Sequence, residues 1–304
     1  ENDSRQGRTG IIVDRYGRKV MERRMNRLQA GIKTKIVFYT AILIFVAAAG
    51  YPIFWVIMSS FKDSADMANL APYQMPRKLY LGNYITAFAG GKLTRYFLNS
   101  VIVAVCTLIG IVCVSAPAAF SIAKLRFRQS DMLLKFFLLG MMIPVFTCLI
   151  PMFQIYGTLG LRNTYLSLIL PQIGFSLPMC IFLYVGFMQF VPNELMESAA
   201  MDGASNWRIF LTIIFPMARN STVTILIYNF VNIWNEFTYA NTFMTDSRMK
   251  TLPVGLNDFV GEMGKRDWGG TFAAITIAIL PTMIIYFILN KQVMAGMAAG
   301  AVKS

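Results

Sequence analysis

Six long apolar runs, separated by hydrophilic stretches, constrain the fold of this chain more than any other feature. The first run, 36–58, contains no charged residue, and a helix of that length crosses a hydrocarbon core of about 30 Å at about 1.5 Å per residue. Membrane β-strands would need short segments of alternating polarity instead. The pattern therefore predicts an all-α integral membrane protein with six transmembrane helices. The runs cover approximately residues 36–58, 96–122, 133–155, 166–189, 219–244 and 271–290.

Composition and charge distribution support a membrane location. The chain is 56% hydrophobic and only 14% charged, whereas soluble domains are about one quarter charged. Its net charge is +13, and ten of its 28 basic residues lie in the first 35. Basic residues beside a membrane helix are attracted to anionic lipid and retained in the cytoplasm. We expect membrane lipid as a partner and no nucleic acid, with both termini cytoplasmic: a basic tail at 1–35, a six-helix domain at 36–290 and a tail at 291–304.

The residue types needed for catalysis or metal binding are sparse. The chain has no histidine, which removes the commonest general base and metal ligand. All four cysteines lie inside apolar runs without C-x-x-C spacing, and Cys106 and Cys113 share a helix face on which we expect packed thiols. We predict no catalytic residue, no metal site, no cofactor in this chain and no disulfide framework.

Charges inside the predicted spans separate the possible transport mechanisms. Glu236, near the outer end of the fifth run, is the one candidate buried carboxylate, and ion-coupled carriers usually need several such groups. The sequence also lacks a G-x-x-x-x-G-K-[ST] phosphate loop. If the protein pumps, another subunit must supply the energy. An ion-coupled secondary transporter of a polar solute is the alternative, and an intramembrane enzyme is a further, poorly supported one.

Prolines within the apolar runs predict kinks. Each proline removes a backbone donor, which a helix bundle tolerates when neighbouring groups satisfy the freed carbonyl. Pro171 and Pro178, with Gly174 between them, predict that the fourth helix is the most distorted.

Residues 192–216, which we call the knob, form the strongest local signal. Charged residues in this segment would each cost about 2.5–3.5 kcal/mol at mid-membrane, so it stays at the surface. Asn193 is a favourable N-cap, Gly203 can adopt the left-handed conformation that ends a helix, and Ser205 can cap a second helix that runs to Pro216. The segment predicts two short helices joined by a sharp glycine turn.

The knob resembles the EAA loop of binding-protein-dependent ABC importer permeases. That pattern is E-A-A, three residues, G, nine residues and I-x-L-P. Glu197, Ser198 and Ala199 occupy E-A-A, Gly203 the glycine, and 213–216 the ending, with Ser198 and Phe215 as departures. The likeness covers nearly the whole chain and points to the maltose-type six-helix subunit for carbohydrate uptake. Further segments that carry it are SSFK at 59–62, RYFLNSVIVAV at 95–105, LGLRNTYLSLIL at 159–170, WNEF at 234–237, TLPVGL at 251–256 and GMAAGAVKS at 296–304.

The resemblance implies a type I ABC importer permease fold with a cytoplasmic coupling helix, in a bacterial plasma membrane. It implies a second permease subunit, two cytoplasmic ATPase subunits that hold the ATP and magnesium, and an extracellular sugar-binding protein. The external loops would be 59–95 and 245–270. Asp258 and Trp268 of the latter would meet the binding protein, and a solvated loop is the alternative for this segment. A plain surface loop is the alternative for the knob. The ATPase-coupling residues it implies are Glu197, Ser198, Ala199, Asp202, Gly203, Ala204 and Pro216.

Polar residues in the fifth run form the candidate substrate path. Asn229, Asn232 and Glu236 share a helix face at i, i+3 and i+7. Hydroxyl-rich solutes need amide and carboxylate partners with an aromatic platform, and this segment supplies both. The alternative is that the amides only join helices. A second stripe beside this face consists of Tyr228, Asn232, Asn235 and Tyr239, with Trp234 nearby.

Overall fold

The computed structural model describes residues 34–89, 92–125, 127–261 and 268–301. The chain divides into two units, residues 1–58 and 59–304. The described part of the first unit belongs to one apolar helix, Thr34–Ser60, most of whose side chains are exposed. The predicted basic tail lies outside the described residues, apart from its last two positions.

Long apolar helices account for most of the described chain. Four of the described helices have the length and composition of membrane spans: Thr34–Ser60, α4 (Lys92–Lys124), α7 (Leu166–Met188) and the Trp268–Ile288 part of α15 (Trp268–Ala301). Two bent helix pairs also qualify, which gives up to six spans. The predicted all-α membrane fold is confirmed. In α15 the helix continues through residues 291–301, which the sequence pattern placed in a tail.

The third predicted span, 133–155, is not one straight helix. Its two halves, α5 (Ser130–Gly140) and α6 (Val145–Thr158), meet at an angle of 88°. The break falls before Pro144, which has extended backbone angles and no N–H to continue the helix. By contrast, α7 runs unbroken through Pro171 and Pro178. The expectation that the fourth helix is the most distorted is therefore wrong.

The fifth predicted span, 219–244, ends as a helix well before its apolar run does. The helix α11 (Arg219–Trp234) stops at Asn235, and a separate short helix, α12 (Thr238–Phe243), follows. The other helical segments outside the long helices and the 192–216 region are short. They are η3 (Ser247–Met249), α13 (Leu252–Gly255) and α14 (Asn257–Gly261) after α12, and α2 (Ser64–Asn69) and α3 (Gly82–Phe88) before α4.

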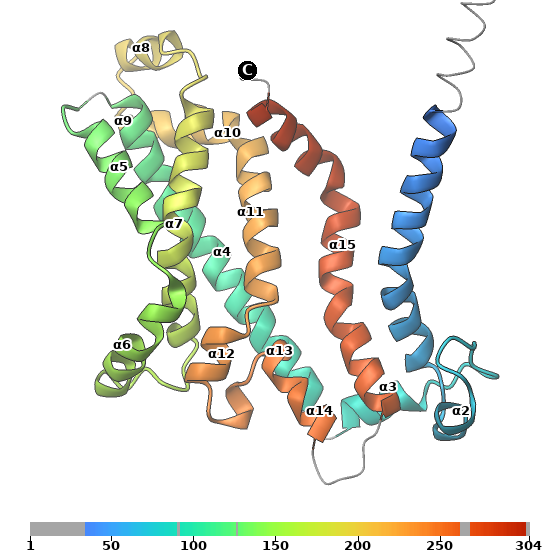
Figure 1. Cartoon of the computed structure of the whole chain (residues 1–304). Coiled ribbons are helices and arrows are strands. Elements are labelled where there is room, and N and C mark those ends of the chain that lie inside the picture. The colour runs from blue at the N-terminus through green and yellow to red at the C-terminus, as the bar shows by residue number, and fades with distance from the viewer. Residues whose placement is uncertain (1–33, 90–91, 126, 262–267, 302–304) are drawn as a thin grey trace, which may run out of the picture. The chain divides into compact units, whose positions relative to one another are not determined.

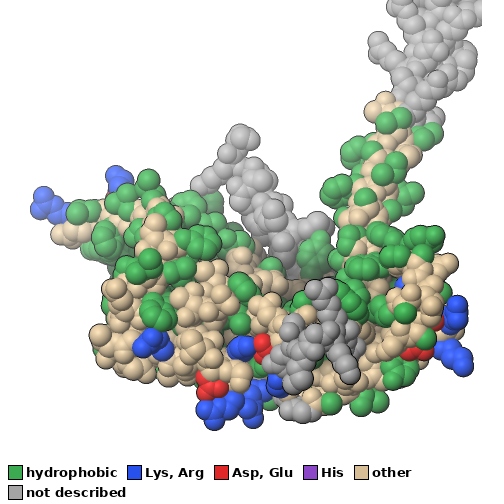
Figure 2. Space-filling model, turned by 60° about the horizontal axis from the view of Figure 1, so that its bottom comes forward, with side chains coloured by type: hydrophobic (Ala, Val, Ile, Leu, Met, Phe, Trp, Pro, Cys, Tyr) green, Lys and Arg blue, Asp and Glu red, His purple; other side chains and the backbone are tan. Residues whose placement is uncertain are grey.

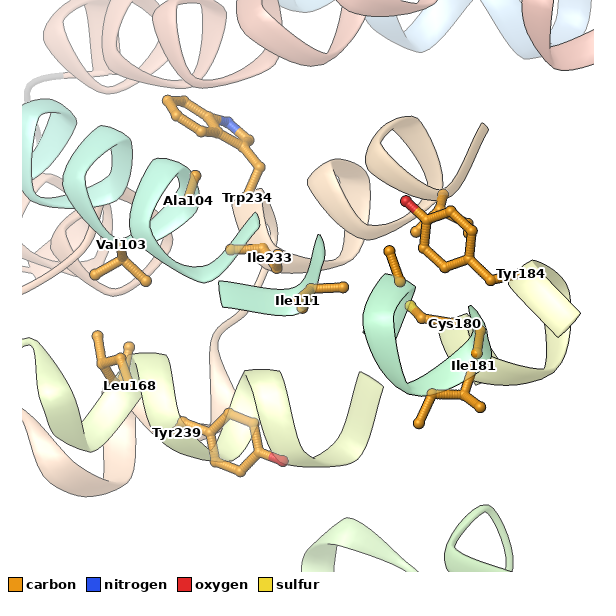
Figure 3. Close-up of a cluster of buried hydrophobic side chains, with 14 of the residues drawn as sticks. Val103, Ala104, Ile111, Leu168, Cys180, Ile181, Tyr184, Ile233, Trp234 and Tyr239 are labelled. Carbon is orange, nitrogen blue, oxygen red and sulfur yellow. The ribbon is translucent and has the colours of Figure 1, made fainter. Parts of the chain in front are cut away.

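The core of the second unit lies where α4 packs against α7, with α11 and α15 beside them (Figure 1). Many side chains in the core are small or β-branched, which lets the helices pack closely. The core residues are almost completely buried. Cys106 and Cys113 are exposed on α4, so the expectation that they are packed is wrong. Figure 3 draws part of the core, with Val103, Ala104 and Ile111 of α4, Leu168, Cys180, Ile181 and Tyr184 of α7, and Ile233 and Trp234 of α11.

The second unit has two different ends (Figure 1). One end holds α8 (Glu194–Met201), and we call it the α8 end. The opposite end holds α12, α13 and α14, and we call it the α14 end. The long helices α4, α7, α11 and α15 run between the two ends and connect them.

Candidate functional sites

The first half of the knob is a short helix that a glycine terminates. After α8, the N–H of Gly203 donates to the carbonyl of Ala200 at 3.0 Å, and the N–H of Ala204 donates to that of Ala199 at 3.0 Å. This pair of bonds is a Schellman motif, which needs a left-handed residue at its centre. Gly203 supplies it with φ of +80°. The predicted glycine turn is confirmed.

The second half of the knob is a helix that changes its winding before a proline. The Ser205 side chain accepts from the N–H of Arg208 at 3.3 Å and caps the short helix α9 (Asn206–Ile209), as predicted. A π-helical turn, η2 (Phe210–Ile214), and the short helix α10 (Phe215–Met217) follow. Pro216 has no N–H to donate to a helical hydrogen bond, and the wider π-helical turn lies directly before the position where this bond is absent. The Asn206–Met217 segment then meets α11 at 73°.

The base of the knob is fixed by a residue that the sequence pattern did not suggest. Asn193 makes no side-chain cap to α8, so its predicted N-cap role is wrong. Its side-chain oxygen instead accepts from Lys124 Nζ at 3.0 Å, and the same ammonium donates to the carbonyl of Val191 at 2.6 Å. Lys124, the last residue of α4, is only 8% exposed. A contact between residues so far apart in the chain overrides the local capping preference.

The outer face of the knob is exposed, and it combines charged with large apolar side chains. Glu197, Ser198, Asp202 and Pro216 are exposed, and Met201 is 87% exposed. Such a surface suits docking to another protein, since exposed apolar groups in a charged setting mark interaction sites. The inner face is different. Ala199 and Ala204 are partly buried and pack against the hydrophobic core together with Met196.

A cavity of about 210 Å³ lies between α7 and α11. It is walled by side chains of both helices and of the segment that follows α11, and its lining mixes amides, hydroxyls, one carboxylate and aromatic rings. Tyr228 and Asn232 on the α11 wall are exposed, so the cavity is open on that face. The lining residues are Gln172, Phe175, Ser176, Met179, Tyr228, Asn229, Asn232, Ile233, Glu236 and Tyr239.

Two polar atoms in the cavity wall are buried without a hydrogen-bond partner in the described part of the chain: Gln172 Oε1 and the Tyr239 hydroxyl. The two residues are 6% and 5% exposed. An unsatisfied buried polar group costs about 1–3 kcal/mol, so both atoms are ready to bond a polar ligand. Gln172 was missed from the sequence because an amide on α7 gains meaning only when α11 packs opposite it.

The predicted substrate-path residues divide into two groups. Asn229, Asn232, Glu236 and Tyr239 meet at the cavity. Glu236 lies beyond the end of α11, so the predicted shared helix face is wrong for this residue, although the fold returns it to the same place. Its carboxylate accepts from the N–H groups of Tyr239 at 2.6 Å and of Ala240 at 3.1 Å.

Two predicted path residues lie away from the cavity lining. Trp234 is buried, stacks on Phe230, and donates its indole N–H to the carbonyl of Ala278 in α15 at 3.0 Å. Asn235 is exposed and donates to the carbonyl of Val231 at 2.8 Å, within its own helix. Trp234 therefore joins α11 to α15, and Asn235 bonds locally, so both side chains have structural contacts in the described chain.

The α14 end is held together by side-chain bonds from the first turns of α4. Asn99 Nδ2 donates to the carbonyls of Arg248 and Lys250 at 3.0 and 2.8 Å, and its oxygen accepts from the Tyr165 hydroxyl at 2.8 Å. Ser100 Oγ accepts from the N–H of Leu252 at 2.8 Å. The loop after α12 is therefore fixed to α4 at several points.

Asp258 in α14 is bound within the chain. Its carboxylate accepts from the Tyr96 hydroxyl and from Lys250 Nζ, each at 2.6 Å. Burial raises the pKa of the Asp258 carboxyl, but the bonds from Lys250 and Tyr96 outweigh burial, so the pKa lies below its ordinary value. The predicted meeting of Asp258 with an external protein would compete with these bonds. Trp268, the other predicted contact, is partly exposed at the start of α15, and residues 262–267 lie outside the described chain.

Figure 2 brings the α14 end forward and shows basic side chains gathered beside acidic ones on it. The pair Arg248–Asp246, with its nearest atoms 2.8 Å apart, contributes to this surface, with the arginine largely and the aspartate partly exposed. The hydrogen bond from Arg248 lowers the pKa of the Asp246 carboxyl. Charge at this end and hydrocarbon side chains along the helices match a protein whose ends reach water on either side of a membrane.

Comparison with known proteins identifies one family. Residues 115–298 match the model for "binding-protein-dependent transport system inner membrane component". The chain is 32% identical over 271 residues to the putative ABC transporter permease protein ORF2 of Caldicellulosiruptor sp., with 89% of this chain and 98% of that protein covered. It is also 32% identical over 250 residues to the diacetylchitobiose uptake system permease protein NgcG of Streptomyces coelicolor, with 82% of each covered.

The fold is similar to a solved structure. That chain belongs to the crystal structure of a bacterial ABC transporter involved in the import of the acidic polysaccharide alginate, and the TM-score is 0.73. The two chains are 19% identical, and the match covers 84% of this chain and 95% of the other. The helices and bends described above therefore form the type I permease fold.

Proposed function

Because the chain belongs to the family of binding-protein-dependent transport system inner membrane components, we propose that it is the sugar-conducting permease subunit of an ATP-driven importer. A chain of this family is a multi-pass membrane protein and a transport subunit, not an enzyme. The observation that carries the proposal is the exposed helix–glycine–helix knob at one end of a bundle that has no phosphate-binding loop of its own.

The proposed assembly has four kinds of component. This chain pairs with a second permease, and the two stand on two ATPase subunits that bind ATP and magnesium. A sugar-binding protein delivers the substrate from outside. We place the α8 end and both termini in the cytoplasm, in agreement with the basic residues at 1–35. The α14 end then faces the binding protein.

The knob is proposed to dock into the ATPase. Glu197, Ser198 and Asp202 present charge and hydrogen-bonding groups on the exposed face, and the Gly203 turn sets the angle between the two short helices. When ATP closes the ATPase dimer, a push on the knob reaches the bundle through the helices fixed to its base. Ala199 and Ala204 pack the knob against the core, and Pro216 marks the turn into α11.

The cavity between α7 and α11 is proposed as one wall of the sugar path. Its volume is smaller than the roughly 300–1,000 Å³ of a complete small-molecule site. A second permease that covers the open Tyr228 and Asn232 face would supply the other wall. The unpartnered Gln172 and Tyr239 atoms suit hydroxyl groups, which both donate and accept.

The names of the relatives support a carbohydrate as the solute. One is a diacetylchitobiose uptake permease, and the similar fold belongs to a transporter that imports alginate. The aromatic rings and amides of the cavity agree with such a solute. An ion-coupled carrier is less well supported, because both oxygens of Glu236 accept from backbone N–H groups at the start of α12 instead of standing free for an ion.

Reconstitution tests the proposed function. The chain is purified from native membranes with the proteins bound to it, and the binding protein is titrated with mono- and oligosaccharides to identify the sugar. We expect a second permease and an ATPase in the complex, and uptake into vesicles that needs ATP and the binding protein. Accumulation by this chain alone under a proton or sodium gradient would contradict the proposal.

A pair of matched variants tests the cavity. Gln172→Met removes the unpartnered oxygen, together with the bond from Nε2 to the Leu168 carbonyl within α7, with little change in volume, and we expect a raised KM for uptake of the identified sugar. Thr107→Val is the control, since Thr107 Oγ1 is also buried without a partner in the described residues but does not line the cavity. Equal uptake by Gln172→Met and the wild type would remove the cavity from the path.

A further inference from the structure

One helix is bonded to both functional ends of the molecule. We propose that α4 transmits movement of the knob to the α14 end, and that Lys124 is the positioning residue that fixes the knob to α4. The inference rests on the proposed function, because it takes the knob as the point where an ATPase pushes. It adds a defined mechanical route and a residue that the loop motif does not include.

At the α8 end, two contacts join α4 to the knob, one on each side of the glycine turn. Lys124 donates to the carbonyl of Val191 and to the side chain of Asn193, directly before α8. The Phe120 ring packs against Phe210, which follows α9, with ring centroids 5.3 Å apart. The first contact is polar and directional, and the second is apolar. A displacement of either short helix therefore meets the last turns of α4.

Lys124 is suited to this role by its place on the helix. As the last residue of α4, it brings a positive charge to the negative end of the helix dipole, which favours a cation. A charged donor makes stronger hydrogen bonds than a neutral one, and the bond to Val191 is short. Val191 is itself buried, so a movement of the corner between α7 and α8 also displaces Lys124.

At the α14 end, the same helix holds the loop that follows α12. Tyr96, Asn99 and Ser100 bond to groups between residues 248 and 258. These three residues lie within the first turns of α4, and Lys124 is its last residue. Asn163, just before α7, accepts from the N–H groups of Thr245 and Asp246 at the start of the loop, whereas the bonds from Tyr96, Asn99 and Ser100 hold the part that follows. A shift of α4 along or about its axis therefore moves residues 248–258 with it.

The helix between these ends is continuous. It has 33 residues, which correspond to a length of about 50 Å at about 1.5 Å per residue. Pro117 lies inside α4 without ending it. By comparison, the knob reaches α11 only across the 73° bend, where a push changes direction. The α4 route crosses no such bend. The helix α7 is also unbroken and leads directly into the knob, and it is the route that loss of Lys124 would leave intact.

Hydrogen exchange on the assembled complex tests the route without knowledge of the sugar. The complex from native membranes is measured with and without ATP plus vanadate, which holds the ATPase closed. In the wild type we expect nucleotide to change exchange in two places, α8 and residues 246–258. With Lys124→Met, the change at α8 persists and the change at 246–258 is lost.

Three further variants make the result specific. Lys124→Arg keeps a charged donor and restores the response at 246–258. Arg128→Met removes a nearby exposed cation and leaves both responses intact. Asn193→Ala removes one of the two acceptors and weakens the response, and it serves as the test if Lys124→Met does not assemble. Combining Lys124→Met with Asn99→Ala adds nothing to the loss, because both cut one route.

The outcomes separate this inference from the function beneath it. If nucleotide leaves α8 unchanged in the wild type, the proposed docking of the knob fails. If α8 responds and residues 246–258 respond equally in the wild type and Lys124→Met, docking stands and the α4 route is wrong. An unchanged response in Asn193→Ala, where Lys124→Met does not assemble, overturns the role of Lys124.

Discussion

The two ends of the bundle are held in opposite ways. At the α14 end, side chains bond across the fold, and Tyr96 in α4 reaches Asp258 far along the chain. At the knob, the bonds are mostly local, as in Ser198 to the Glu194 carbonyl and Ser205 to the Arg208 N–H. The α14 end is completed by its own chain. The knob is fixed at its base and leaves its outer face for another protein.

Two glycines show the same contrast. Gly203 has φ of +80°, and a Cβ there would meet nothing within 4 Å. Gly255 in α13 has an ordinary backbone, but a Cβ there would overlap the buried Tyr96 ring. The first glycine is required by the shape of the chain and the second by the packing around it. The turn at Gly203 therefore leaves open space beside it, in agreement with the proposed docking of the knob.

The largest effect is expected at the knob turn. Gly203→Pro imposes φ near −65° where +80° is needed, and it removes the N–H that bonds Ala200. We expect sugar uptake by the reconstituted complex to be abolished while ATP hydrolysis persists and the bundle still folds. Asp202→Lys, which reverses an exposed charge, should uncouple as well. Normal uptake by both variants would break the contrast between the ends.

The second prediction compares the two glycines directly. Gly255→Ala should lower the free energy of unfolding by about 1–3 kcal/mol, because the new methyl group displaces Tyr96 from Asp258. Gly203→Ala strains only the knob, which can fray locally. Thermal unfolding of the purified protein should show a lower Tm for Gly255→Ala alone. The opposite order would mean that the knob is part of the stabilising core.

The third prediction concerns pH. Because the pKa of Asp258 is lowered in the folded protein, its stabilising contribution is complete above the unfolded value of about 3.9. The contribution is lost as pH falls through the lower, folded value. The Tm difference between the wild type and Asp258→Asn should therefore be constant from about pH 8 to 5 and shrink in stronger acid. A difference that instead grows below pH 5 would show that the carboxyl is not held as a charged group.

The smallest effect is expected for the exposed ion pair. Arg248→Ala removes the bond to Asp246, but the arginine side chain is 73% exposed and the aspartate 30%, and ion pairs at such water-accessible sites contribute little. The α14 end should survive, since the Arg248 carbonyl still accepts from Asn99. We expect no measurable change in Tm at any salt concentration. A clear loss would mean that surface charge, and not the buried network, holds this end.

The sequence predicted what local chemistry or apolar length decides. A Schellman turn at Gly203 and a cap at Ser205 depend on neighbours in the chain, and both are present. Apolar length indicated the spans. Prolines were less informative, because a missing donor breaks the third run at Pro144 yet leaves α7 whole at Pro171. Whether a freed carbonyl is satisfied depends on neighbouring helices, which the sequence pattern does not place.

Contacts between distant segments account for the other misses. Asn193 has the composition of an N-cap, but Lys124 binds it from another helix. Gln172 became a candidate because α11 forms the opposite wall of its cavity. Glu236 was placed on a helix that ends two residues earlier, at Trp234, and the start of α12 brings it to the cavity. The functional role of each knob and path residue stays a prediction until the variants are measured.

The most direct test of the central claim is photo-crosslinking from the knob in native membranes. A photo-reactive residue replaces Glu197, and a matched control replaces Asn257, which is exposed on the α14 end. We predict that position 197 captures a nucleotide-hydrolysing protein and that position 257 does not. Failure of position 197 to capture any such protein, in membranes where uptake is intact, would contradict the account.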